Sequence, residues 1–245
     1  MNESLIYGIR PVIEAIEAGK QIDKIYVKRG SDAPLIRQLR DVAKQHRVQV
    51  QEVPVEKLNR LTKNANHQGA VAVAAAIEYA DIAEVVDAVE RRGEVPLIVV
   101  FDGVTDVRNF GGIARSAECA GVHALIVPIK NSAPVNADAI KSSAGALNLI
   151  PVCRVGSIRN TLRYLQERGI QIAAASEKGD KMLYQANLKK PTALVMGSED
   201  TGISREILKM CDTTLAIPLV GSIESLNVGA AAAVLLFEAV RQRMK

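Results

Sequence analysis

The side chains best suited to chemistry lie in three short segments of the last two-thirds of the chain. Each segment begins with an apolar run and passes through a Gly- or Ser-containing turn towards a helical pattern, at residues 101–121, 194–202 and 217–240. The turns carry amide, hydroxyl and charged groups, namely Asn109, Arg115, Glu199, Ser225 and Asn227. α/β proteins place ligands where parallel strands end and loops begin. The three segments therefore predict one active site for a polar, phosphate-bearing substrate.

The motifs that the chain lacks narrow the chemistry. No G-x-x-x-x-G-K-[ST], G-x-G-x-x-G or G-x-S-x-G sequence is present, so a P-loop, a standard dinucleotide fingerprint and a hydrolase elbow are excluded as direct matches. The three histidines are scattered, and the cysteines (Cys119, Cys153 and Cys211) have no C-x-x-C spacing. We therefore expect no metal site and no disulfides, only buried free thiols. Methyl transfer from a sulfonium donor fits, because the donor brings the reactive carbon and the protein mainly positions it.

Hydrophobic periodicity predicts an α/β fold that divides near residue 78. In the first part we expect helices within 7–19 and 34–46, and strands at 24–28, 48–53 and 70–76. A helix at 81–93 could serve as a linker. Beyond it, strands are expected near 97–101, 124–127, 171–175, 193–196 and 213–217, and helices near 112–120, 136–143, 157–168, 204–210 and 226–243. Such alternation predicts a mostly parallel sheet covered by helices. We expect domains at 1–77 and 95–245, joined by residues 78–94.

Charge and length indicate the compartment and one class of partner. Residues 1–77 hold twelve Lys and Arg against eight Asp and Glu, so the net charge of +4 lies entirely in this part. Arg37, Arg40 and Lys44 share one helical face, and Lys57, Arg60 and Lys63 share another. These faces are either solvated helix surfaces or a phosphate-facing surface for nucleic acid. Neither a signal peptide nor a membrane span is visible, so we expect a cytoplasmic protein with no membrane partner.

The three segments resemble the three motifs of the SpoU, or TrmH-like, family of RNA ribose 2′-O-methyltransferases. The first resembles the family's Asn with an Arg six residues on, here Asn109 and Arg115. The second resembles Gly-x-Glu-x-x-Gly, here Gly197, Glu199 and Gly202. The third resembles Ile-Pro followed by Ser-Leu-Asn-Val, here 217–218 and 225–228. The N-terminal YGIRPVIEAI and HQGAVA (67–72) resemble the substrate-binding domain of RlmB-type members, which methylate a guanosine ribose in large-subunit ribosomal RNA.

The chain departs from the family pattern at a few positions. Phe110 and Gly112 stand where many relatives carry Pro or Leu and Asn or Ala, and Gly229 stands where Ser is common. Arg10 and Pro11 replace the Arg-His usual in RlmB-type members. The proposed catalytic groups stay intact, but the assignment of a particular nucleotide is weakened.

The resemblance implies a fold, a donor and an assembly. It implies a trefoil-knotted, SPOUT-type catalytic domain, S-adenosyl-L-methionine as methyl donor, and a homodimer whose active site lies near or across the interface. Donor binding is expected from the main chain around Met196, Gly197, Ser198, Ile217, Leu219 and Leu226. RNA binding is expected from Arg37, Arg40, Lys44, Lys63 and His67.

The chemistry of each catalytic candidate suggests a role for it. Arg115 suits a phosphate beside the target ribose, because its guanidinium donates in a fixed geometry and almost never loses its proton. Glu199 could accept the proton of the 2′-hydroxyl or orient its loop. Asn109, Ser225 and Asn227 would position the ribose and the loops. Taken singly, Asn109 could instead form an Asx-turn before its helix, and Ser225 is the expected N-cap of the last helix.

Three other functions stay open. The substrate could be transfer RNA rather than ribosomal RNA. The chain could also be a non-catalytic RNA-binding assembly factor of the same fold, although the intact Asn109, Arg115, Glu199 and Asn227 favour an enzyme. A nucleotide-binding α/β enzyme of another kind is a weaker alternative, because the glycine fingerprints are missing.

Overall fold

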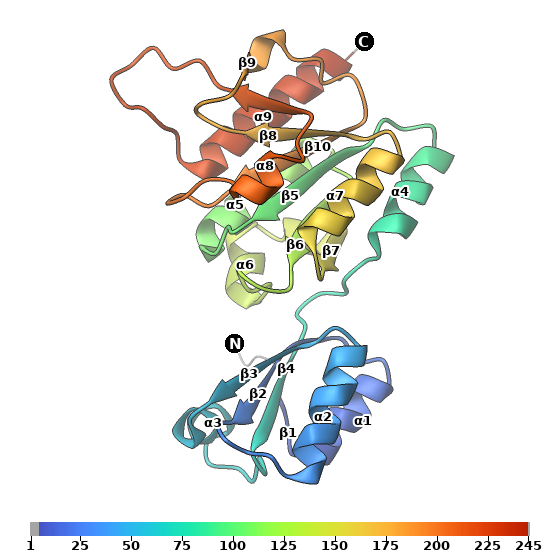
Figure 1. The fold of residues 1–245 in the computed structure, drawn as a ribbon, viewed down its shortest axis with the longest axis vertical. Coiled ribbons are helices and arrows are strands. Elements are labelled where there is room, and N and C mark those ends of the chain that lie inside the picture. The colour runs from blue at the N-terminus through green and yellow to red at the C-terminus, as the bar shows by residue number, and fades with distance from the viewer. Residues whose placement is uncertain (1–4, 245) are drawn as a thin grey trace. The chain divides into compact units, whose positions relative to one another are not determined.

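The chain forms two compact units. The computed structural model describes residues 5–244, so the first four residues of the predicted 1–77 domain and the final Lys245 lie outside the described residues. One unit is made largely of residues 5–78 and the other largely of residues 79–244. Figure 1 shows them as a blue-to-cyan unit and a green-to-red unit.

The first unit is a four-stranded sheet with helices on both faces. Its strands are β1 (Leu5–Tyr7), β2 (Ile22–Lys28), β3 (Gln49–Val53) and β4 (Ala70–Ala74), and its helices are α1 (Ile9–Glu17), α2 (Pro34–Gln45) and α3 (Val55–Thr62). The strand order is β1-β4-β2-β3; β4 is antiparallel to both neighbours, and β2 and β3 are parallel. The apolar stripes of α1 and α2 pack on the sheet with Ile25 and Ala72. Leu58 of α3 packs with Val53 and Val71 in a separate small cluster.

The second unit is built on a seven-stranded parallel sheet. Its strands are β5 (Leu97–Asp102), β6 (Ala124–Pro128), β7 (Val152–Val155), β8 (Gln171–Ala175), β9 (Lys181–Met182), β10 (Thr192–Gly197) and β11 (Thr213–Ala216). Its helices are α4 (Ile82–Arg91), α5 (Val107–Cys119), α6 (Ala137–Ser142), α7 (Ile158–Glu167), α8 (Arg205–Leu208) and α9 (Val228–Arg243), with short 3₁₀ turns at η1 (Ala146–Asn148) and η2 (Leu183–Gln185).

The order of the strands places β10 at a switch point. The order is β7-β6-β5-β10-β8-β11-β9, and every pair is parallel. The chain builds outwards from β5 to β6 and β7, and β10 later enters between β5 and β8. Ligands of open α/β sheets bind at the carboxyl ends of the strands where the order reverses. The expected place for a ligand is therefore the end of β10, at Gly197.

Helices cover both faces of this sheet (Figure 1). On one face, α4, α7 and α8 pack on the strands through Val86, Leu162 and Ile207. On the other face α5 and α9 lie against each other, and α9 also packs on β8 and β10. Phe110 of α5 meets Phe101 of β5 edge to face, with ring centroids 5.0 Å apart. The predicted parallel sheet covered by helices is thus confirmed.

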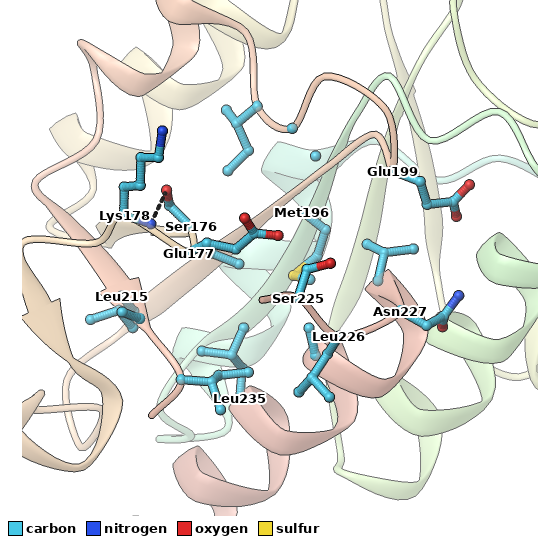
Figure 2. Close-up of a pocket in the computed structure, with 18 of the residues that line it drawn as sticks. Ser176, Glu177, Lys178, Met196, Glu199, Leu215, Ser225, Leu226, Asn227 and Leu235 are labelled. Carbon is cyan, nitrogen blue, oxygen red and sulfur yellow. Dashed lines mark hydrogen bonds between the residues drawn. The ribbon is translucent and has the colours of Figure 1, made fainter. Parts of the chain in front are cut away.

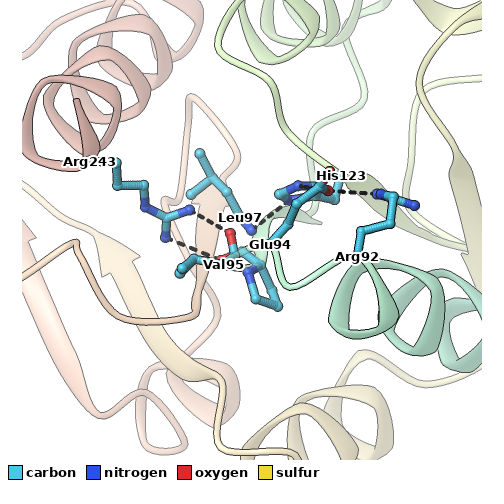
Figure 3. A network of polar contacts seen from close by, with 7 residues as sticks. Arg92, Glu94, Val95, Leu97, His123 and Arg243 are labelled. Carbon is cyan, nitrogen blue, oxygen red and sulfur yellow. Dashed lines mark hydrogen bonds and ion pairs between the residues drawn. The ribbon is translucent and has the colours of Figure 1, made fainter. Parts of the chain in front are cut away.

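Polar contacts fasten the amino ends of the strands (Figure 3). Arg243, in the last turn of α9, donates to the carbonyls of Leu188 (2.9 Å), Val95 (2.8 Å), Pro96 (3.1 Å) and Lys190 (2.8 Å). The carbonyl oxygens accept hydrogen bonds from the charged guanidinium. Burial lowers the pKa of Arg243 from its ordinary value. Five donors in a fixed fork suit an Arg to hold several carbonyls at once.

A histidine lies on the other side of β5 in the same network. His123 accepts the Leu97 N–H at Nδ1 (3.0 Å), so its own proton lies on Nε2, which faces Glu94 at 3.2 Å. Glu94 also pairs with Arg92 at 2.7 Å. Burial lowers the pKa of His123, against the opposing influence of Glu94. The ring therefore serves as a neutral brace at the start of β5.

The predicted element boundaries fail in places that have physical causes. The short strands β1, β7 and β9 were not expected, and the helix expected near 112–120 begins at Val107. Asp106 caps it by accepting the N–H groups of Arg108 and Asn109. Gly111 disfavours a helix in sequence terms, yet a Cβ there would lie 2.0 Å from Ser142 Oγ of α6. Close helix packing thus accounts for this glycine.

The cysteines bear out only part of the expectation. Cys153 is buried and Cys211 half-buried, and burial raises the pKa of each thiol to about 12. Cys119, at the end of α5, is exposed, so the prediction of buried thiols is wrong there. All three are free, and residues 5–244 contain no group of three or more His, Cys, Asp and Glu side chains placed to hold a metal ion. Nor does any helix of this range have the length and apolarity needed to cross a membrane.

Candidate functional site

A cavity of about 880 Å³ lies at the carboxyl ends of β8, β10 and β11. It is lined by the loops that follow these three strands and by the start of α9 (Figure 2). All six residues predicted to bind the donor line it: Met196, Gly197, Ser198, Ile217, Leu219 and Leu226. Its size is typical of pockets for small ligands. The second and third sequence segments therefore converge on one cavity.

Gly197 is required by the fold itself. A Cβ at this position would lie 2.3 Å from the backbone of both Gly202 and Ile203. The chain after β10 folds back so tightly that Ser198 and Gly202 exchange backbone hydrogen bonds of 3.0 and 2.9 Å. The motif suggests that Gly197 allows a ligand to approach the main chain closely. The structure shows that Gly197 also allows the backbone of Gly202 and Ile203 to approach it closely.

Ser198 closes the turn that carries Glu199. Its hydroxyl lies 2.7 Å from Thr201 Oγ1 and accepts the Thr201 N–H at 3.1 Å. Both bonds hold the 198–202 turn in one shape. Glu199 is exposed at the tip of this turn, at the mouth of the cavity, and its carboxylate points away from Met196 and Ser225 on the side of Asn227 (Figure 2).

Three candidate catalytic side chains form one hydrogen-bonded chain at this mouth. Asn227 Oδ1 accepts the N–H groups of Gly229 (2.9 Å) and Ala230 (3.4 Å), which fixes the orientation of its amide. Its Nδ2 then donates to Asn109 Oδ1 at 3.0 Å, and Asn109 Nδ2 donates to the Glu199 carboxylate. The three residues come from α5, the β10 loop and the start of α9. Each donor points in the same direction, towards the carboxylate.

Two assignments of helix caps need correction. Asn227, not Ser225, is the N-cap of α9, because its side chain accepts the first free N–H groups of that helix. Asn109 forms no Asx-turn, since it lies inside the first turn of α5, and its side chain is turned to Glu199. Ser225 lines the cavity and is exposed, which leaves its hydroxyl accessible to a ligand.

Arg115 stands apart from the other four candidates. It is exposed on α5 and does not line the cavity. Six residues of α-helix separate it from Asn109, which corresponds to about 9 Å along the axis and a rotation of about 240°. The two side chains therefore leave different faces of α5, and the structure of one chain does not bring Arg115 to the cluster of Asn109, Glu199 and Asn227.

A second wall of the cavity was not predicted from the sequence. The loop after β8 contributes Ser176, Glu177 and Lys178, and the long loop before α9 adds Glu224. That long loop has no regular structure and is exposed from Pro218 to Asn227, with Ile223 75% exposed. An acidic residue two positions after a parallel strand was the available signal, because such loop positions face the carboxyl edge of a sheet.

The RNA-binding candidates on α2 have two different surroundings. Arg40 pairs with Glu52 at 2.7 Å and Arg37 lies 3.8 Å from Asp32, whereas Lys44 is exposed. The Arg40 guanidinium lowers the pKa of Glu52. Ion pairs offset part of the positive charge of this face, so Lys44 is its most available cation.

The remaining two RNA-binding candidates flank the turn after α3. Lys63 is exposed and adopts a left-handed conformation with φ of 51°. His67 is buried; Nδ1 accepts the Gly69 N–H at 3.0 Å, and Nε2 lies 2.8 Å from Asn59 Oδ1. Both ring nitrogens thus hold the turn, so the His67 ring is occupied by contacts within its own unit.

The fold and the cavity together define a class of protein. This is an α/β protein whose carboxyl-edge loops enclose a pocket of small-ligand size, with an amide–amide–carboxylate chain at its mouth. Comparison with known families makes this specific. Residues 96–237 match the SpoU rRNA Methylase family, and residues 5–80 match the family domain for RNA 2′-O ribose methyltransferase substrate binding. The chain belongs to the SpoU rRNA methylase family.

Several full-length relatives carry one name. The 23S rRNA (guanosine-2′-O-)-methyltransferase RlmB of Photorhabdus laumondii is 40% identical over 98% of this chain and 98% of its own length. The RlmB of Vibrio parahaemolyticus is 38% identical over 100% of this chain and 99% of its own. Among solved structures, the SpoU methyltransferase AviRb from Streptomyces viridochromogenes, in complex with the cofactor AdoMet, is 31% identical, with a TM-score of 0.62 over 98% of this chain and 90% of that one.

Proposed function

We propose that this protein transfers the methyl group of S-adenosyl-L-methionine to the 2′-hydroxyl of a guanosine ribose in 23S ribosomal RNA. Family membership and the names of the full-length relatives support the reaction and the class of RNA. The observation that carries the proposal is the meeting of Asn109, Glu199 and Asn227 at the mouth of a cavity built from the family's motifs.

The cavity has the chemistry that this donor needs. Leu215, Leu226 and Leu235 offer an apolar surface for the adenine. Main-chain groups at Met196, Gly197 and Ile217 would hold the remaining polar atoms. When bound, the donor supplies an electrophilic methyl carbon on a positively charged sulfur.

The side chains at the mouth have distinct tasks. The attacking 2′-oxygen must lose its proton as it gains the methyl group, and Glu199 is the carboxylate placed to accept that proton. Asn109 holds Glu199 through one N–H, and Asn227 fixes Asn109 while it caps α9. Polar groups that are already oriented need no rearrangement during the reaction. The hydrogen bonds from Asn227 to Asn109 and from Asn109 to Glu199 therefore preorganise the Glu199 carboxylate. Ser225 would contact the target ribose of the RNA.

Arg115 requires a partner subunit in this scheme. We propose a homodimer in which Arg115 of one chain holds a phosphate of the RNA bound at the mouth of the other. What supports this is the exposure of Arg115 on α5, away from the cavity of its own chain. The half-exposed Phe237 on the neighbouring α9 is a suitable apolar contact for such an interface.

Three further assignments rest on the resemblance. The 5–78 unit would bind RNA through Lys44, Lys63 and the partly neutralised Arg37 and Arg40. The C-terminal unit would carry a trefoil knot, which the late entry of β10 between β5 and β8 and the packed loops around Gly197 favour. The protein would act in the cytoplasm, where ribosomal RNA is assembled.

Ribose-methylation mapping tests the function. RNA from cells that lack the protein should miss one 2′-O-methylguanosine of 23S ribosomal RNA, and the wild-type chain should restore it. A loss confined to transfer RNA would transfer the activity to that substrate. Methylation unchanged throughout, together with defective ribosome assembly, would favour a non-catalytic assembly factor.

A further inference from the structure

The loop after β8 places one carboxylate in the donor cavity. This carboxylate belongs to none of the three motifs. Glu177 lies two residues beyond the end of β8 and lines the cavity. In Figure 2 its carboxylate extends towards Met196 and Ser225, whereas the side chain of Lys178 is directed elsewhere. Within residues 5–244, neither a hydrogen bond nor an ion pair engages the Glu177 carboxylate. It is therefore available to a ligand.

The main chain that carries Glu177 is fixed on both sides. Ser176 N–H donates to the Leu215 carbonyl at 3.0 Å, and Gly179 N–H donates to the Ser176 carbonyl at 3.1 Å. A Cβ at Gly179 would lie 2.5 Å from the backbone nitrogen of Ala216, so only glycine allows the loop to rest on β11.

Asp180 locks the far end of the same loop. Its carboxylate accepts the Thr214 N–H at 2.8 Å and the Thr214 hydroxyl at 2.6 Å, and its own N–H donates to Thr214 Oγ1 at 2.8 Å. The hydrogen bonds from Thr214 lower the pKa of Asp180. Glu177 is thus presented by a short, doubly anchored turn, and a contact made from such a turn costs little ordering.

The two ends of the cavity differ in chemistry. The chain of Asn227, Asn109 and Glu199 lies at one end, where the methyl group must be delivered, and Leu215 and Leu235 lie towards the other (Figure 2). The apolar end suits the adenine, and the Glu177 carboxylate lies between the two ends, directed towards Met196 and Ser225 (Figure 2). The group of the donor nearest to Glu177 is then its ribose.

We propose that Glu177 accepts hydrogen bonds from the 2′- and 3′-hydroxyls of the donor's ribose, and so selects an adenosine with an intact cis-diol; this rests on the proposed use of S-adenosyl-L-methionine. A carboxylate has two oxygens and can accept from both hydroxyls of a cis-diol. Dinucleotide-binding sheets use the same device, an acidic residue near the end of a parallel strand that neighbours the phosphate-binding one. Here β8 is the neighbour of β10.

Binding of three ligands to the Glu177→Gln protein tests the assignment. All three ligands carry the adenine and the ribose diol. S-adenosyl-L-methionine adds a sulfonium and an amino-acid group, S-adenosylhomocysteine has the amino-acid group but an uncharged thioether, and 5′-methylthioadenosine has the thioether without the amino-acid group. Calorimetry should show all three binding about tenfold more weakly than to wild type, since one charge-assisted contact is lost. Glu224→Gln, the same charge change at another carboxylate of this cavity, is the matched control and should leave 5′-methylthioadenosine binding within about twofold.

Each other outcome overturns the assignment. If Glu177→Gln binds 5′-methylthioadenosine as wild type does but binds the other two ligands more weakly, Glu177 contacts the donor's ammonium group instead of its ribose. Weaker binding of S-adenosyl-L-methionine alone would give it to the sulfonium. If Glu224→Gln weakens the binding of 5′-methylthioadenosine as much as Glu177→Gln does, Glu177 acts only through the overall negative charge of the cavity. Wild-type protein that binds none of the three ligands would instead refute the proposed function. Thermal unfolding of Glu177→Gln confirms that the comparison is made on folded protein.

Discussion

Asn227 has two tasks that one pair of substitutions can separate. Its Oδ1 caps α9, and its Nδ2 donates to Asn109, which in turn holds Glu199. Asn227→Asp keeps the capping oxygen but has no N–H to donate. Asn227→Ala removes both functions. The two variants should therefore differ in stability and agree in lost activity.

The expected sizes follow from the contacts. Loss of an N-cap costs about 1 kcal/mol, which for a unit of this length lowers Tm by roughly 2–4 °C, so Asn227→Ala should show this shift. Asn227→Asp should unfold within about 1 °C of wild type, because Asp and Asn cap equally well. In both variants Glu199 loses the fixed Asn109 donor, and methylation should fall on the order of a hundredfold.

Thermal unfolding and single-turnover methylation with labelled donor measure the two effects. Asn160→Asp, an exposed position in the first turn of α7, controls for a negative charge added at a helix N-terminus and should leave methylation unchanged. Near wild-type methylation by folded Asn227→Asp would refute the hydrogen-bonded chain as part of the mechanism. Equal destabilisation in Asn227→Asp and Asn227→Ala would refute the cap.

Three other predictions concern the partner subunit, the RNA surface and pH. Arg115→Ala should keep donor binding but lose methylation about a hundredfold, and mixing it with Asn227→Ala subunits should restore part of the activity, because one hybrid site would be whole; mixtures as inactive as the separate variants would place both groups on one chain. Lys44→Gln should weaken RNA binding and reduce the slope of log K against log salt concentration by about 0.7–0.9, as one phosphate contact is lost; an unchanged slope, measured by filter binding, would move the RNA surface elsewhere. His123 has a lowered pKa in the folded protein, so the unfolded chain binds more protons just below pH 6.5, and its contribution to stability is complete above that value and declines as pH falls towards the folded pKa. Chemical denaturation at about pH 5.5 and about pH 7.5, on either side of the ordinary histidine pKa, should show this loss in wild type and a smaller loss in His123→Asn; identical pH dependence in both proteins would rule out His123 as the cause.

Much of the catalytic unit could be predicted because its strands are buried on both faces. Continuous apolar runs such as 97–101 and 193–196 are typical of central parallel strands, and they lie at β5 and β10. The residue pattern alone therefore assigns the motif residues after these strands to one edge of the sheet, and all six donor-binding candidates line one cavity.

The failures come from tertiary contacts that leave no local pattern. Gly111 and Gly112 weaken the helical pattern in the first turns of α5. The reason for glycine at 111 is the close packing of Ser142 from α6, which leaves no room for a side chain. Ser225 has the sequence context of an N-cap, yet Asn227 takes that place two residues later. His67 has the chemistry of an RNA ligand but is consumed by Asn59 and Gly69. Glu177 is different, because its place two residues after β8 is a local signal, but its loop lies outside the three motifs.

The clamp formed by Arg243 bears on how the protein is made. Residues 5–78 contain every strand and helix of their own sheet, so this unit can fold while the ribosome is still translating the rest. The second unit has no such freedom. Its β5 begins at Leu97, yet the carbonyls just before it are held by Arg243, and α9 must cover β8 and β10. The part of its sheet that α9 covers therefore stays bare until residue 243 has left the exit tunnel, and the 5–78 unit can fold well before the cavity after β10 is complete.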